Sequence, residues 1–277
     1  MKLSRTRHAS PENAELTSTS MSSSRGEHNT VMGNFGTSLM DIKYKRILLK
    51  LSGEALVGEG KLGIAPEVVD RIAEEISLVH TLGVQVCVVV GGGNIFRGLQ
   101  KSTELGMDRA AADYVGMIAT IMNALVLQGV LEKRGIATRV QTAITMNAIA
   151  EPYIRRRAQR HLAKSRVVIF GGGTGNPFFT TDTAAALRAS EMDCDLMLTA
   201  KNGVDGVYSE DPKKNPQATK FTIMTYQDVL SKDLRVLDTA AIALCRDSDI
   251  PIAVFDFARP GAVRDIVCGL PVGTIIK

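Results

Sequence analysis

Three apolar runs in this chain lead directly into glycine-rich turns. The runs cover residues 46–51, 84–90 and 167–170, and the turns begin at Ser52, Gly91 and Gly171. Nearly unbroken apolar runs are typical of strands that are covered on both faces, as in parallel sheets. Repetition of strand, glycine turn and helix predicts a three-layer αβα sandwich with a mostly parallel central sheet. Because such sheets bind ligands beyond the carboxyl ends of their strands, we expect the three turns to face one crevice.

The remaining pattern fills in this α/β architecture. Helices are predicted over residues 66–80, 109–133, 151–162, 225–232 and 238–246, and further helices begin at Asp182 and Pro260. Strands are predicted over residues 137–144, 196–199, 252–257 and 274–276. Proline in the first turn and glycine just past the end mark the helix at residues 66–80. The apolar stripe within residues 115–130 is interpreted as core or as an oligomer interface.

Composition and charge narrow the class of protein. A formal net charge of +4 over 277 residues suits an anionic small ligand and gives no reason to expect nucleic acid. Four widely spaced cysteines are interpreted as buried free thiols in a reducing, cytoplasmic compartment. No apolar run is judged to approach the roughly 20 residues of a membrane span, so no membrane partner is expected. Four arginines within residues 155–160 are interpreted as a solvated or subunit-contacting face rather than a nucleic-acid site.

Residues 1–42 differ from the rest because they are rich in serine, threonine and asparagine and lack hydrophobic periodicity. We interpret them as a disordered N-terminal extension, followed by a single α/β domain over residues 43–277. A transit peptide and a translation start at Met40 both remain open interpretations. Whichever holds, we expect the extension to be dispensable.

The loop over residues 171–183 reads GGGTGNPFFTTDT and carries the strongest functional signal. A glycine turn between a strand and a helix offers unpaired N–H groups and the positive end of a helix dipole to a phosphate. The polar and aromatic residues of the loop suit a whole nucleotide, although Phe178 and Phe179 could equally anchor the loop in the core. Lys50, in an apolar strand, suits a phosphate partner, or else snorkels at a strand end. Arg97 suits a phosphate beside the turn at Gly93, or else lies on the surface.

Of two common nucleotide-binding motifs, one is absent from the sequence and the other gives only a weak signal. The phosphate-binding string GxxxxGK[ST] does not occur. GxGxxG does occur at Gly58, Gly60 and Gly63, but it does not directly follow a strand, so a flexible or regulatory loop is the better interpretation.

The strings KLSGEA, GGGNIFRG, TGNPFFTTD and VDGVY, in this order, resemble bacterial uridylate (UMP) kinases of the amino-acid-kinase superfamily. The resemblance runs from about Tyr44 to the C-terminus. It implies transfer of the γ-phosphoryl group of ATP to UMP with Mg²⁺ held through ATP phosphates, a homohexamer, and GTP and UTP as effectors. The implied catalytic residues are Lys50, Arg97 and Asp182. The implied ATP site consists of Lys50, Ser52, Gly53, Gly93, Arg97, Asn202, Tyr208 and Asp211. The implied UMP site consists of Gly92, Asp113, Thr174, Gly175, Asn176, Pro177, Phe178, Phe179, Thr180 and Thr181. The implied GTP loop contains Gly58, Gly60 and Gly63.

The chain departs from the family pattern at one place. Where some members read KATKVDGV, this chain reads TAKNGVDGV from Thr199, which is one residue longer. Either Lys201 or Thr199 could therefore occupy the place of a second phosphate-contacting lysine. Two rival functions share the predicted fold: a kinase for another acceptor, such as an amino acid or carbamate, and a non-catalytic nucleotide sensor.

Overall fold

The computed structural model describes residues 41–58, 62–96, 106–201, 203–212, 214–232, 234 and 236–277. Within them, nine strands form one sheet in the order β4-β3-β5-β2-β1-β6-β10-β11-β9. Strand pairs in this sheet are parallel except for β10 and β11. The strands are β1 (Arg46–Leu51), β2 (Gln85–Val90), β3 (Thr138–Thr142), β4 (Glu151–Pro152), β5 (Val167–Gly171), β6 (Leu196–Lys201), β9 (Ile223–Met224), β10 (Ile252–Asp256) and β11 (Thr274–Ile276). A separate antiparallel pair joins β7 (Val207–Tyr208) to β8 (Lys220–Phe221).

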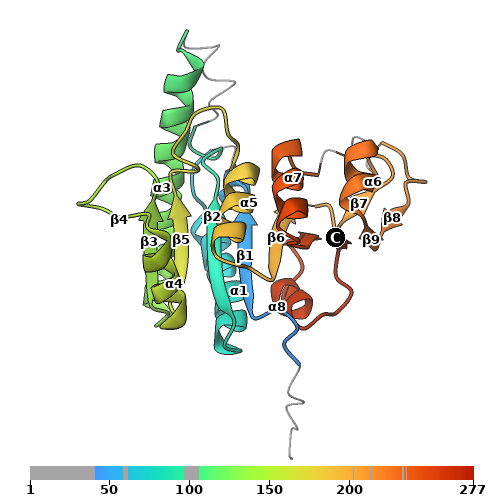
Figure 1. The fold of residues 1–277 in the computed structure, drawn as a ribbon, viewed down its shortest axis with the longest axis horizontal. Coiled ribbons are helices and arrows are strands. Elements are labelled where there is room, and N and C mark those ends of the chain that lie inside the picture. Colours follow the sequence, from blue (N-terminus) through green and yellow to red (C-terminus); the bar gives the residue numbers. More distant parts are fainter. Residues whose placement is uncertain are drawn as a thin grey trace, which may run out of the picture. The chain divides into compact units, whose positions relative to one another are not determined.

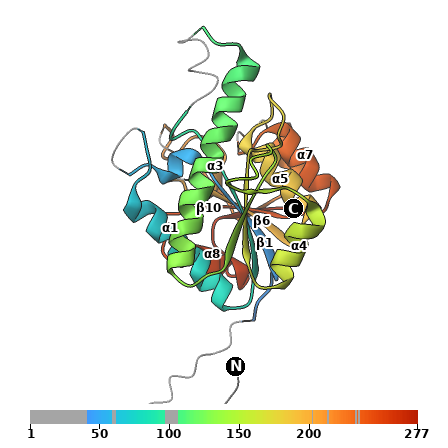
Figure 2. The same cartoon turned by 90° about the vertical axis from the view of Figure 1, so that its left-hand side faces the viewer.

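Helices cover both faces of the sheet (Figures 1 and 2). One face carries α1 (Pro66–Thr81), α3 (Arg109–Lys133) and α8 (Ala262–Val267), and the other carries α4 (Arg155–Ala163), α5 (Thr181–Glu191) and α7 (Thr239–Asp247). The short helix α6 (Tyr226–Ser231) packs on α7. Alternate residues of β1 serve the two cores: Ile47 and Leu49 belong to the first, and Leu48 to the second. The predicted three-layer αβα sandwich is confirmed.

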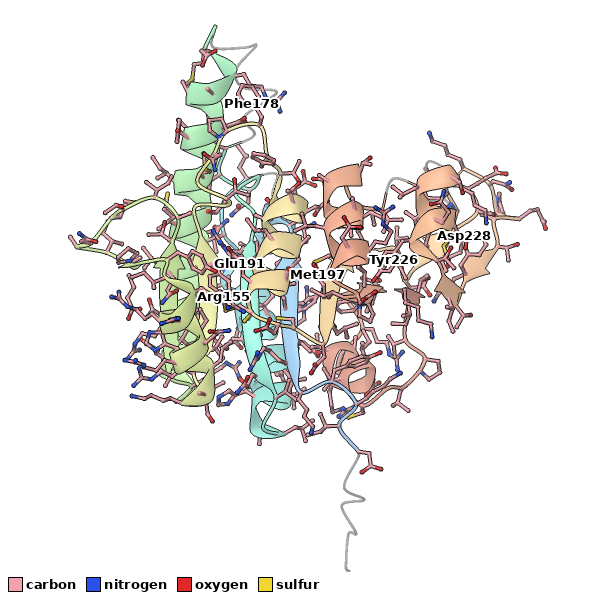
Figure 3. The ribbon with its side chains drawn as sticks, viewed as in Figure 1. Arg155, Phe178, Glu191, Met197, Tyr226 and Asp228 are labelled. Atoms are coloured by element: carbon pink, nitrogen blue, oxygen red, sulfur yellow. The ribbon has the colours of Figure 1, made fainter. Side chains whose placement is uncertain are left out.

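Most predicted elements lie where the pattern placed them, but the segment at residues 151–162 does not form one helix. Glu151 and Pro152 instead form β4, which pairs with the end of β3, and α4 begins only at Arg155. The Gln141 amide donates to the Glu151 carboxylate at 3.0 Å, which ties the two strand ends together. The arginines of α4 are exposed, and Arg155 pairs with Asp193 at 2.9 Å beside Glu191 (Figure 3).

Helix α3 has the length and hydropathy of a membrane span, which the sequence-based expectation overlooked. It is nevertheless a core helix on one side, since Ala124, Leu127 and Leu131 are fully buried against the sheet. Its other side leaves apolar side chains exposed, namely Tyr114, Val115, Ile118, Met122 and Val126. We call these five residues the α3 stripe.

The four cysteines are free, as predicted, and Cys87, Cys194 and Cys245 are buried, but Cys268 is only partly buried, so the expectation of burial is wrong for it. Burial raises the pKa of the Cys245 thiol to about 12, so this side chain stays a neutral core residue near pH 7.

A buried carboxylate holds α8 on α1. Glu75 of α1 is 4% exposed and accepts hydrogen bonds from the N–H groups of Gly261 and Val263, at the start of α8. We expect Glu75→Ala to lower the free energy of unfolding by about 2–3 kcal/mol, because buried N–H donors lose a charged acceptor. Urea unfolding followed by circular dichroism measures this, with Glu74→Ala on the exposed face of α1 as control. Equal stability of the two variants would contradict the prediction.

Candidate functional site

The glycine turns after β1 and β2 lie in direct contact at the carboxyl end of the sheet. The N–H of Gly91 donates to the carbonyl of Leu51 at 2.9 Å. A Cβ atom at Gly53 would lie 2.4 Å from the backbone nitrogen of Gly93, and one at Gly92 would lie 2.6 Å from the carbonyl oxygen of Gly116 on α3. Glycine is therefore required here by close backbone approach, which is what a phosphate-binding turn needs.

The third turn and α3 complete a first cleft of about 270 Å³. Its lining includes seven of the residues expected to bind UMP and one expected to bind ATP: Gly92, Asp113, Thr174, Asn176, Phe179, Thr180 and Thr181, with Gly93. Gly175, Pro177 and Phe178 belong to the same loop but are not among the lining residues. The second and third turns therefore line one cleft, whereas Ser52 and Gly53 of the first turn are not among its lining residues and meet it only through their contact with the second turn.

The loop is attached to α3 through Asp113. The N–H of Phe178 donates to the Asp113 carboxylate at 2.8 Å, and the Phe178 ring lies 5.4 Å from the Arg109 guanidinium. Phe178 adopts a φ of +70°, a left-handed conformation that is uncommon for a bulky residue. Its side chain is exposed beside the outer end of α3 (Figure 3), and Phe179 is also exposed. The interpretation that these rings anchor the loop in the core is therefore wrong.

An ion pair lies between the central strand and the start of α5. Lys50 of β1 is 6% exposed, and its ammonium lies 2.6 Å from the Asp182 carboxylate. The Thr180 hydroxyl caps α5 by accepting from the N–H groups of Asp182 and Thr183. The interpretation of Lys50 as a snorkelling strand-end lysine is wrong, because its head group is buried and paired. Lys50 and the positive end of α5 are thus held at one point.

The two candidates for a second lysine position have different surroundings. Thr199 lies opposite Lys50 in the register of β1 and β6, is fully buried, and its hydroxyl has no hydrogen-bond partner among the described residues. Lys201, at the end of β6, donates to the carbonyl of Val236 at 2.7 Å. Burial, reinforced by the nearby Lys50 cation, lowers the pKa of Lys201, while Asp182 partly opposes this shift. Lys201 therefore lies near the ion pair that Lys50 forms with Asp182.

Two further clefts adjoin Lys201. One, of about 380 Å³, includes Asp182, Lys201 and Asp238 in its lining. The other, of about 520 Å³, is lined in part by Lys201, Tyr208 and Asp211. Tyr208 and Asp211, both expected at the ATP site, thus line the same cavity. The Tyr208 hydroxyl donates to Asp205 at 2.6 Å, and this bond raises the pKa of Tyr208.

The other predicted site residues are placed as follows. Ser52 lies in the β1 turn, where its hydroxyl accepts from the N–H of Ala55 at 3.2 Å. Gly58 and Gly63 are not among the residues that line these clefts, and Gly63 has a φ of +100°. Arg97, Asn202 and Gly60 lie outside the described residues.

Asp238 is a site residue that sequence reasoning missed. Its carboxylate accepts from the hydroxyls of Thr180 and Thr183, and also from the N–H of Ala241 in the first turn of α7. It therefore joins the starts of α5 and α7. The sequence marks Asp238 as a helix start, but nothing in the pattern indicates which second helix it reaches.

Arg188 is the second such residue. It is 4% exposed on α5, lies 3.8 Å from the Tyr153 ring, pairs with Glu191 at 2.5 Å and reaches the carbonyl of Gly173 at 3.5 Å. Through its contact with Gly173, Arg188 supports the glycine-rich loop from α5. A lone arginine among the alanines of a buried helix face is the signal that could have revealed it.

The arrangement suits chemistry between two anions. Thr181 lines the first cleft and the next residue, Asp182, lines the 380 Å³ cleft, so these two clefts adjoin where α5 begins. Lys50 and Lys201 stand at this junction together with the backbone turns. Cations and N–H groups fixed between two phosphate-binding spaces are what phosphoryl transfer requires, because the reaction depends on positioning and charge neutralisation.

Comparison with known proteins assigns the family. The model of the amino acid kinase family matches residues 45–256. A UMP kinase structure from Bacillus anthracis shares 47% sequence identity, covering 84% of this chain and 96% of that one, with a TM-score of 0.83. A UMP kinase from Ureaplasma parvum shares 37% identity over 85% and 100% of the two chains, with a TM-score of 0.80. A uridylate kinase from Archaeoglobus fulgidus shares 32% identity over 83% and 99%, with a TM-score of 0.66. The chain therefore belongs to the amino acid kinase family, and within it groups with the UMP kinases.

Proposed function

We propose that this enzyme transfers the γ-phosphoryl group of ATP to UMP and forms ADP and UDP. The observation that carries the proposal is the cleft lined by Gly92, Asp113 and five of residues 174–181, which adjoins the Lys50–Asp182 pair. UMP would lie in this cleft. ATP would lie in the clefts beside Lys201, with its base and ribose near Tyr208 and Asp211.

The proposed reaction is an in-line displacement. An oxygen of the UMP phosphate forms a bond to the γ-phosphorus of ATP as the bond from that phosphorus to the β–γ bridging oxygen breaks, and ADP leaves. The acceptor is already an anion near neutral pH, so no general base is needed. Lys50, Arg97 and Lys201 neutralise charge between the nucleotides, and Asp182 orients Lys50 rather than removing a proton.

Magnesium would enter with the nucleotide. Among the described residues there is no group of three or more His, Cys, Asp or Glu side chains able to hold a metal ion. Mg²⁺ is commonly bound through substrate phosphates with only one or two carboxylates from the protein. Asp182 and Asp238 are the carboxylates that line the cleft concerned. When bound, the ion would supply charge neutralisation at the phosphate oxygens.

An acceptor panel tests the proposed function. The purified protein is given Mg·ATP with UMP, CMP, GMP, AMP, aspartate, glutamate or carbamate, and ADP release is measured. Turnover with UMP is the expected result. Turnover only with an amino acid or carbamate would instead favour the rival kinase function. UMP binding without turnover would leave a nucleotide sensor.

We further propose a cytoplasmic homohexamer regulated by GTP and UTP, with Gly58–Gly63 in the GTP loop. The α3 stripe supports self-association, because clustered exposed apolar side chains mark protein interfaces. Asp113, Gly116 and Met117 of the same helix line the first cleft. Assembly and acceptor binding would therefore share one helix.

Met122→Lys tests this assembly. Met122 is 48% exposed in the middle of the α3 stripe, and a buried charge there would oppose association. We expect the variant to sediment as smaller species than the parent protein. Leu78→Lys, at an exposed apolar residue of α1, is the matched control. Sedimentation of Met122→Lys at the parental mass would exclude the stripe as the interface.

The N-terminal extension also remains a proposal. We expect a protein lacking residues 1–39 to keep its unfolding midpoint and its kcat/KM for UMP, because the proposed domain begins at residue 43 and the family match at residue 45. Loss of folding or of turnover on deletion would show that the extension belongs to the working enzyme.

A further inference from the structure

Two asparagines behind the glycine turns form a closed amide pair. Asn94 follows the turn at Gly91–Gly93, Asn123 lies on α3, and each is 1% exposed. The Asn94 amide donates to the Asn123 Oδ1 atom at 3.0 Å, and the Asn123 amide donates to the Asn94 Oδ1 atom at 2.7 Å. Buried side-chain amides of this kind are costly unless every polar atom is paired, so the pair fixes two side chains in one arrangement.

Each amide also binds one backbone carbonyl with its remaining N–H. Asn123 donates to the carbonyl of Gly91 at 2.7 Å, and Asn94 donates to the carbonyl of Gly63 at 2.9 Å. Gly63 returns a backbone bond, from its N–H to the Asn94 carbonyl, at 2.8 Å. The pair therefore ties three segments together: the β2 turn, helix α3 and the chain at Gly63.

The hydrogen bond from Asn123 to the Gly91 carbonyl determines the direction of the neighbouring Gly92 N–H group. The peptide unit that joins Gly91 to Gly92 is planar and trans, so its N–H points away from its C=O. Because Asn123 holds this carbonyl toward the buried side of the turn, the Gly92 N–H points to the opposite side. Gly92 lines the first cleft. The next carbonyl, that of Gly92, accepts from the N–H groups of Ile95 and Phe96, both at 3.0 Å, and this fixes the following peptide unit.

We propose that Asn94 and Asn123 are positioning residues that direct the Gly92 N–H toward the phosphate of the acceptor. The inference rests on the proposed function for the identity of that acceptor. Neither asparagine is among the residues lining the first cleft, so both act through the backbone of the turn rather than by contact with substrate.

Three variants separate positioning from folding. Asn123→Leu keeps the branching of the side chain, but it leaves the Asn94 Oδ1 atom, one Asn94 N–H and the Gly91 carbonyl without their partner, while Asn94 still donates to Gly63. The double variant Asn94→Leu/Asn123→Leu removes both partners of the pair, which costs less stability than orphaning one of them. Thr138→Val is the control, since it deletes a buried hydrogen bond, from Thr138 to the Ile136 carbonyl at 3.0 Å, away from the cleft.

The expected kinetic result follows from misplacement of a phosphate-binding group. We expect kcat/KM for UMP to fall about 100-fold in Asn123→Leu, and to stay low in the double variant although its unfolding midpoint recovers. We expect Thr138→Val to change kcat/KM by no more than about threefold, because it leaves the turn intact. In an enzyme that phosphorylates UMP, parental kcat/KM in a folded double variant would overturn the inference.

Hydrogen exchange supplies a readout that does not depend on turnover. Residues 91–96 should exchange faster in Asn123→Leu and in the double variant than in Thr138→Val, because the bonds of Ile95 and Phe96 to Gly92 are no longer held. Unchanged exchange would overturn the inference on its own. If the parent protein fails to phosphorylate UMP, the proposed function fails, while exchange still decides whether the asparagines hold the turn.

Discussion

Lys50→Met is expected to lower kcat for UMP phosphorylation by about 1,000-fold, because a fixed cation between two phosphates is lost from a preorganised site. Methionine keeps the length and the apolar stem of the lysine and can remain buried in β1. The ammonium that lies 2.6 Å from Asp182 disappears. Initial rates at saturating ATP and UMP measure the effect.

The control must separate catalysis from the effect of an unpaired carboxylate. Lys50→Met/Asp182→Asn removes both charges, so we expect it to be more stable than Lys50→Met and equally inactive. Lys164→Met, at an exposed lysine beyond the end of α4, should keep parental rates. A folded Lys50→Met protein with more than about a tenth of the parental kcat would contradict the role proposed for this lysine, since such residues supply far larger factors.

Lys201→Met is expected to reduce kcat/KM for ATP by about 100-fold, as loss of one preorganised donor to a transferring phosphate commonly does. Thr199→Val decides between the two candidates left open by the sequence. It removes the hydroxyl opposite Lys50 without changing shape, and we expect it to alter ATP kinetics by no more than about threefold. The opposite ranking of the two variants would place the second phosphate contact at Thr199.

The same lysine predicts a pH dependence. Its pKa is lowered from the ordinary value by burial and by Lys50, so the free enzyme loses this positive charge as pH rises through the lowered pKa. The KM for ATP should therefore begin to rise at a lower pH than it would if Lys201 had the pKa of an ordinary lysine. Lys201→Met should lack this rise. Parallel pH profiles of the two proteins would contradict the assignment.

The sequence predicted the sheet and its crevice because apolar runs and glycine turns are local signals. The run at β2 and the glycines after it required a strand that ends in a tight turn, and the structure confirms both. Helix α3 was predicted with its observed bounds, with Gly135 marking its end, and in the structure the Asp108 carboxylate caps its start. The resemblance implied that both Lys50 and Asp182 belong to the site, but the local pattern could not pair them, because the two residues are far apart in the sequence.

What the sequence could not reveal depends on contacts between distant segments. The two-residue strand β4 forms only because β3 lies beside it, and its own composition suggested a helix. The hydrogen bonds that Asp238 accepts from Thr180 and Thr183 form only because α7 packs on α5. The membrane-like composition of α3 reflects one side facing the core and another facing outward as the α3 stripe, and a pattern alone does not tell which apolar residues are buried.

The contact between the turns at Gly53 and Gly93 bears on how such an enzyme can evolve. With no space for even one carbon atom at Gly53, neither turn can shift without the other, so the spacing of the two phosphate-binding turns is a property of the backbone. The contact with residues 174–181 is looser, since a Cβ atom at Gly91 would lie 3.2 Å from the Thr181 hydroxyl oxygen. New acceptors could thus be selected by exchanging side chains in the loop and helix, while the geometry of transfer is inherited unchanged.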